Sequence, residues 1–90
     1  MLNYSLSYHH VDHSKSFEKY LLNKLENMNR LMGNVGSVNL VADRNGQEFS
    51  FSARVNGKNG KFYSKADSAN VYQAASKVMS RVKAWLQLHK

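Results

Sequence analysis

Residues 37–66 read SVNLVADRNGQEFSFSARVNGKNGKFYSKA, and this stretch decides the fold. Apolar and polar residues alternate through three successive runs, which is the period of a half-buried β-strand. The first run ends at Asp43-Arg44-Asn45-Gly46, where Asn45-Gly46 indicates a tight hairpin turn before the second run. Residues 56–60, Asn-Gly-Lys-Asn-Gly, form a turn cluster before the third run, a short strand at 61–66. Because short turns join antiparallel neighbours, the stretch predicts a three-stranded meander.

The residues before this stretch predict a further strand and a long helix. Residues 2–9 alternate apolar and polar side chains, as another half-buried strand would. From Ser14 to Leu31 the apolar residues recur at spacings of three and four, which is typical of an amphipathic helix. Ser14 suits the N-cap, because its hydroxyl can accept a hydrogen bond from a backbone N–H, and Gly33 suits the C-terminal stop.

The residues after the stretch predict a second helix that closes the chain. Asp67-Ser68 is a candidate N-cap pair, and an apolar stripe follows from Val71 to His89. The element order is therefore β-α-β-β-β-α. Strand one reaches strand two through a helix and should lie parallel to it. We expect an α+β fold, a two-layer sandwich with a four-stranded mixed sheet and both helices on one face, in a single domain over residues 1–90.

The alternation also predicts what each face of the sheet carries. Leu6, Phe49, Phe51 and Phe62 should point at the helices. The opposite face should then hold uncharged polar residues and cations. The residues expected there are Ser5, Ser7, Asn39, Ser50, Ser52, Arg54, Lys61, Tyr63 and Lys65.

Composition narrows the class of protein. Apolar residues make up 42% of the 90 residues, which is ordinary for a globular chain. Cysteine is absent, so disulfides, thiolate metal sites and cysteine nucleophiles are excluded. The sequence starts without a signal-peptide pattern, and no apolar run approaches the roughly 20 residues of a membrane span. We expect a soluble cytoplasmic protein.

The net charge of +7 is concentrated in the C-terminal part of the chain. Residues 53–90 contain eight basic side chains and the single acid Asp67. In residues 1–52 the numbers of basic and acidic side chains are equal. Such asymmetry attracts a polyanion, either nucleic acid or an anionic membrane surface, and the near absence of acids favours structured RNA. The predicted RNA-binding residues are Arg54, Lys58, Lys61, Lys65, Lys77, Arg81, Lys83 and Lys90.

Other chemistry has little support in the sequence. Residues 9–13, His-His-Val-Asp-His, could supply metal ligands, but adjacent strand residues point to opposite faces, so we expect no metal site. The spacings Gly33-x-x-Gly36 and Gly57-x-x-Gly60 lack the following Lys-Ser/Thr of a phosphate loop. Neither a nucleophile elbow nor a carboxylate pair stands out. We therefore expect neither an enzyme nor a cofactor or small-molecule substrate.

Residues 59–75, NGKFYSKADSANVYQAA, resemble the ribosome hibernation promoting factor and ribosome-associated inhibitor family, also called the sigma-54 modulation protein family. The segment is similar to the family's hairpin turn, last strand and helix entry, where an Asp-Met-Tyr-x-Ala-Ile motif begins the second helix. Tyr72 and Ala74 match that motif. Further along this helix, Ala84 and Leu88 stand where the family usually has cations.

The resemblance implies a fold similar to double-stranded RNA-binding domains and a protein that silences idle ribosomes. Such a protein would bind small-subunit rRNA, occlude the channel for tRNA and mRNA, and act as a monomer, because the chain stops before the dimerisation domain of longer members. Two alternatives stay open: a general double-stranded RNA-binding module, and a protein-interaction domain with an acidic partner. The residues leave open whether the protein promotes or prevents ribosome pairing.

Overall fold

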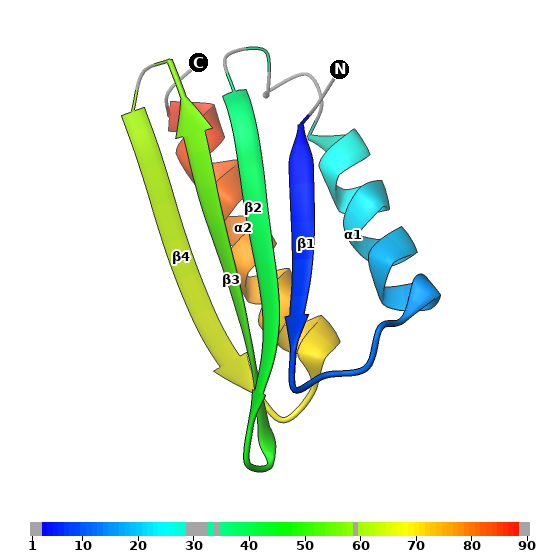
Figure 1. Ribbon diagram of the computed structural model, residues 1–90. Helices are drawn as coiled ribbons and strands as arrows, with labels where there is room; N and C mark the ends of the chain where they lie inside the picture. The colour runs from blue at the N-terminus through cyan, green and yellow to red at the C-terminus, as the bar shows by residue number, and fades with distance from the viewer. Residues whose placement is uncertain (1–2, 29–32, 34, 59, 89–90) are drawn as a thin grey trace.

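The structure is a computed structural model that describes residues 3–28, 33, 35–58 and 60–88. Its elements, in chain order, are β1 (Tyr4–His9), α1 (Lys15–Asn27), β2 (Val35–Asn45), β3 (Glu48–Gly57), β4 (Gly60–Ser68) and α2 (Val71–Leu88). The strands form one sheet in the order β1-β2-β3-β4. β1 is parallel to β2, and the other neighbours are antiparallel. The α+β order and the mixed sheet confirm the expected fold (Figure 1).

The core lies between the sheet and the two helices. Phe17 and Leu21 of α1, Phe51 and Val55 of β3, and Val78 of α2 are at most 2% exposed. The ring of Phe17 meets that of Phe51 edge-on, with centroids 5.9 Å apart, so α1 covers the same face of the sheet as α2. Figure 1 looks onto the opposite, open face, with α2 behind the sheet and α1 next to β1.

The predicted inward residues are buried to different extents. Leu6 and Phe62 pack at the margin of the core, and Phe51 lies at its centre. Phe49 is only half-buried, because it lies next to the β2–β3 turn, where the Arg44 guanidinium covers its ring at 5.5 Å.

Helix α1 begins where the sequence predicts and ends earlier. The Ser14 hydroxyl accepts a hydrogen bond of 3.2 Å from the Phe17 backbone N–H, which confirms the N-cap. The helix ends at Asn27, and the Met28 N–H donates to the Leu25 carbonyl at 3.1 Å, a tightened last turn. The predicted stop at Gly33 is therefore wrong, and the predicted last helical residue, Leu31, lies outside the described residues.

The N-cap predicted for the second helix is also wrong. Asn70 caps α2: its side-chain oxygen accepts from the Tyr72 N–H at 2.7 Å, and its carbonyl accepts from the Ala74 N–H. Asp67 and Ser68 belong instead to β4, which is longer than predicted. An amide at Asn70 satisfies the first helical N–H groups as well as a serine hydroxyl would.

The β2–β3 hairpin turns one residue later than predicted. Asn45 pairs with Glu48, so the two turn residues are Gly46 and Gln47. Gly46 has φ +68°, a backbone conformation that glycine adopts without steric cost. Glycine at the first of two turn positions is typical of a type II′ hairpin. Strand β2 consequently extends beyond the predicted end and includes Asp43.

Candidate nucleic-acid interface

Strand register sorts the open face of the sheet into rows. One row runs from Ser5 through Asn39 and Arg54 to Tyr63 across all four strands. The Arg54 guanidinium carbon lies 5.6 Å from the centroid of the Tyr63 ring, and Tyr63 is 55% exposed. These two side chains border a shallow hollow of about 280 Å³. An exposed aromatic ring with an adjacent guanidinium can stack on a nucleobase and neutralise its phosphate.

Five predicted cations surround the edge strand β4, and we call them the basic edge. They are Arg54 of β3, Lys61 and Lys65 of β4, and Lys77 and Arg81 of α2. Lys61 and Lys65 alternate with inward residues and so point to the open face. All five residues are exposed. Three elements thus bring positive charge to one margin of the sheet.

Hydrogen bonds hold α2 against β4 within the basic edge. Arg81 Nη1 donates to the Lys65 carbonyl oxygen at 3.0 Å and to Ser64 Oγ at 3.3 Å. Ser64 is 7% exposed, so this contact also satisfies a buried hydroxyl. Lys77 precedes Arg81 by one helical turn and therefore lies on the same flank of the helix.

The open face is not free of acids, which corrects the prediction. Asp43 lies opposite Ser50, which lies opposite Asp67, in a row four residues along the strands from Arg54. The Ser50 hydroxyl donates to Asp67 Oδ1 at 2.5 Å. At the rise of a strand, this acidic row is about 13 Å from the Arg54 row. The face is therefore graded, with its positive potential toward the β3–β4 turn.

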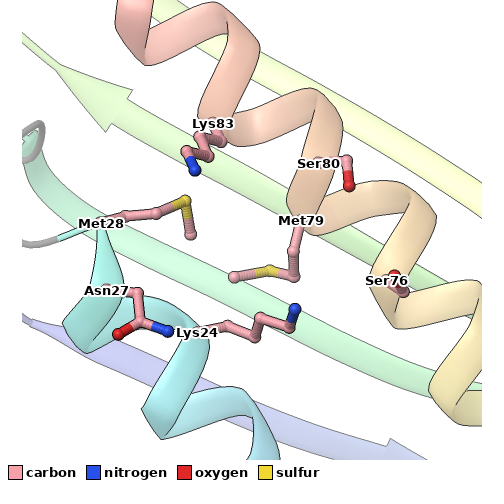
Figure 2. A pocket seen from close by; sticks show the side chains of 7 residues that line it. All are labelled: Lys24, Asn27, Met28, Ser76, Met79, Ser80 and Lys83. Carbon is pink, nitrogen blue, oxygen red and sulfur yellow. The ribbon is translucent and has the colours of Figure 1, made fainter.

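The remaining predicted cations do not join the basic edge. Lys83 lies on the other flank of α2, where it lines a groove between the helices with Lys24 of α1 (Figure 2). Lys58 is exposed in the β3–β4 turn, beyond the end of β3. Lys90 lies outside the described residues. The seven predicted cations among the described residues thus divide between two surfaces and the turn.

Sequence reasoning missed Lys24 as a site residue. The helical period shows that Lys24 is four residues after Tyr20 and that both flank the apolar stripe of α1. In the structure the Lys24 ammonium lies 5.5 Å from the centroid of the Tyr20 ring. Which flank of α1 meets α2 depends on packing, so the sequence alone does not pair Lys24 with Lys83.

The described part of the chain has neither a cluster of metal ligands nor a membrane-spanning helix. Residues 3–28, 33, 35–58 and 60–88 contain no group of three or more metal-ligating side chains close enough to share an ion. Over these same residues, neither helix is long and apolar enough to cross a membrane. The rings of Tyr8 and His13 are in contact, with centroids 4.3 Å apart and planes tilted by 33°, and this contact packs the loop before α1.

Comparisons with known proteins agree with this fold. The ribosomal subunit interface protein of Coxiella burnetii superposes with a TM-score of 0.89 at 15% identity, over 98% of this chain and 97% of that one. The N-terminal domain of Protein Y from Thermus thermophilus gives a TM-score of 0.89 at 17% identity, over 100% of both chains. At these identities the two structures show the fold alone. No curated protein matches the sequence.

Family assignment comes from the sequence itself. The profile of the family described as sigma 54 modulation protein / S30EA ribosomal protein matches residues 4–90, a range that includes every described strand and helix. A match over nearly the whole chain confirms the resemblance found in residues 59–75. The chain therefore belongs to the sigma 54 modulation protein / S30EA ribosomal protein family, a family of ribosome-associated factors that are not enzymes.

Proposed function

We propose that the protein silences idle ribosomes by binding small-subunit rRNA and occupying the channel that tRNA and mRNA use. The basic edge carries this proposal, because Arg54, Lys61, Lys65, Lys77 and Arg81 gather from three elements around one strand. Spaced cations on a rigid support match the phosphates of a folded RNA better than they match a single small anion. Family membership supports the ribosome as the source of that RNA.

Occlusion requires no chemistry from the protein. A body with principal extents of 37 × 21 × 17 Å can block a channel if it is anchored firmly at one margin. The basic edge would supply the anchor, and the rest of the domain would supply the bulk. We propose further that the protein works as a monomer in the cytoplasm, with no membrane or small-molecule partner.

Sedimentation with purified small subunits tests the proposal. The wild-type protein should travel with the subunits at low salt, and the logarithm of its association constant should fall with the logarithm of salt concentration with a slope of about −4, because each of roughly five phosphate contacts releases counterions. The double variant Lys65→Glu, Lys77→Glu should lose binding. Both side chains are exposed, and the Arg81 contacts to β4 stay in place.

A matched control separates local charge from net charge. The double variant Lys15→Glu, Lys19→Glu changes the net charge equally, at two exposed positions of α1. It should bind nearly as well as the wild type. Equal weakening by both double variants would show a non-specific polycation. Binding to naked duplex RNA as tight as to subunits would instead support the general double-stranded RNA-binding module.

Channel occupancy needs its own measurement. Small subunits loaded with mRNA and initiator tRNA should exclude the protein, and prior binding of the protein should slow tRNA binding. Simultaneous binding of all three would overturn the occlusion step while leaving rRNA binding intact. If subunit binding persists in the Lys65→Glu, Lys77→Glu variant, the contact is better explained by a protein-interaction surface.

A further inference from the structure

The groove between the two helices has an apolar floor and a polar rim. Met28, after the end of α1, and Met79, in the middle of α2, form the floor, and each is 3% exposed. Lys24 of α1 and Lys83 of α2 stand on its two sides, with their side chains reaching toward the methionines (Figure 2). The groove encloses about 170 Å³ and is open to solvent.

The rim supplies hydrogen-bonding groups of both kinds. Asn27 contributes an amide, and Ser76 and Ser80 contribute hydroxyls that line the groove from α2. No carboxylate is among the described residues that line it. Methionine side chains adapt to flat aromatic rings and contact them favourably through sulfur. The groove therefore combines a surface for a planar ring, an amide and hydroxyls for polar ring edges, and two ammonium groups for a phosphate.

We propose that this groove seats one unpaired nucleotide of an RNA strand, with its base on Met28 and Met79 and its phosphate between Lys24 and Lys83. This inference rests on the proposed function, since it takes RNA as the partner, and it adds a site on the face opposite the open sheet. Unstacked nucleotides of loops and bulges are what proteins read in folded RNA.

The aromatic residues beyond the groove extend this surface. The Lys24 ammonium nitrogen lies 5.5 Å from the centroid of the Tyr20 ring. The rings of Tyr20 and Tyr72 meet edge-on, with centroids 5.2 Å apart. Tyr72 is 37% exposed. The exposed ring of Tyr72 offers a stacking surface for a neighbouring base, which a site for a bare anion would not need. The limited volume also disfavours a docked helix, which would require several apolar pockets in line.

Two hairpin RNAs that differ by a single bulged nucleotide provide the probe. The protein is labelled with ¹³C in its methionine methyl groups, and the Met28 and Met79 signals are followed during titration. The bulged hairpin should shift both signals and bind about tenfold more tightly than the fully paired one. Inorganic phosphate and an acidic amphipathic peptide are titrated in parallel.

Two variants and one control locate the effect. Ser76→Phe fills the groove at a partly exposed helix position and should abolish the preference for the bulge. Lys83→Gln should weaken binding of the bulged hairpin by roughly fivefold, since it removes one phosphate contact. Lys77→Gln removes the same charge from the other flank of α2 and should weaken both hairpins equally. Trp85 fluorescence verifies that each variant is folded.

The outcomes separate this inference from the proposed function. Equal affinity for both hairpins, methyl shifts reproduced by phosphate alone, or tighter binding of the peptide would each overturn the nucleotide site. If one of these outcomes is found and the wild-type protein still sediments with small subunits, the proposed ribosome binding holds and only the nucleotide site is overturned. A wild type that ignores subunits but still prefers the bulged hairpin would overturn the proposed function and leave the nucleotide site supported.

Discussion

The indole ring of Trp85 on α2 stacks on the phenyl ring of Phe62 on β4, with centroids 5.3 Å apart and planes inclined by 21°. Both side chains pack against the margin of the hydrophobic core. Among the described strands, β4 lies at the edge of the sheet and pairs with β3 alone, so α2 supplies further support. The stack therefore fixes the strand that carries Lys61 and Lys65 of the basic edge.

Replacing Trp85 with alanine should lower the free energy of unfolding by about 3 kcal/mol, because a large, partly buried ring is lost and leaves space at the margin of the core. Urea unfolding followed by circular dichroism measures the change. Leu88→Ala, on the same helix at a side chain that is 82% exposed, is the control and should change stability by less than about 0.5 kcal/mol. Similar losses in both variants would contradict a specific role for the ring stack.

Ser14→Ala should lower the free energy of unfolding by about 1 kcal/mol, since the Phe17 N–H loses the hydroxyl that accepts its hydrogen bond. Thermal unfolding measures the loss. The exposed Ser16 lies in the first turn of α1 and provides the comparison, because Ser16→Ala removes a hydroxyl without removing the cap. A Ser14→Ala protein as stable as Ser16→Ala would show that the cap contributes nothing to this helix.

Arg81→Lys should separate positioning from charge. The ammonium keeps the positive charge but cannot reproduce the contacts of the guanidinium with Ser64 and Lys65, so the protein should lose about 1 kcal/mol of stability. Binding to small subunits should weaken modestly, with an unchanged dependence on salt, because the number of cations is the same. Lys77→Arg is the matched control and should alter neither stability nor the salt dependence. A reduced salt dependence in Arg81→Lys would contradict this assignment.

Removing the acidic row should strengthen RNA binding. The double variant Asp43→Asn, Asp67→Asn keeps an acceptor for the Ser50 hydroxyl but removes two negative charges from the open face. We expect roughly a threefold gain in affinity for small subunits at low salt, which fades at high salt as screening shortens the range of charge. Glu26→Gln, at an exposed position of α1, tests whether any lost acid has the same effect. If Glu26→Gln raises the affinity as much per removed charge as the double variant does, the acidic row has no special effect on RNA binding.

The fold could be predicted from the sequence because its signals are local. Alternation in residues 37–66 defines three strands, and short turns require them to be neighbours, which the register confirms. The ends of the elements were less predictable. Gly46 suits either of two turn positions, and Asn70 competes with Ser68 for the cap of α2, so the choice depends on how far the strands continue to pair.

The part of the candidate site that lies on a single helix could be predicted from the sequence. Lys77 and Arg81 share a flank by helical periodicity, and the structure places that flank against β4. The sequence does not predict the acidic row, because it places Asp43 in a turn and Asp67 at a helix cap, although both continue the alternation of their strands. Lys24 and Lys83 face each other because of how the two helices pack. The apolar periodicity of each helix alone does not predict this packing.

The lysines of β4 have a consequence for solubility. An edge strand with unpaired backbone N–H and C=O groups can pair with the edge strand of another molecule and lead to aggregation. Two copies joined along β4 would bring the ammonium groups of Lys61 and Lys65 close to those of their neighbour, and the repulsion would oppose the union. The lysine charges that we assign to phosphate contacts would thus also oppose self-association. A variant without these two lysines should precipitate at a lower protein concentration than the wild type.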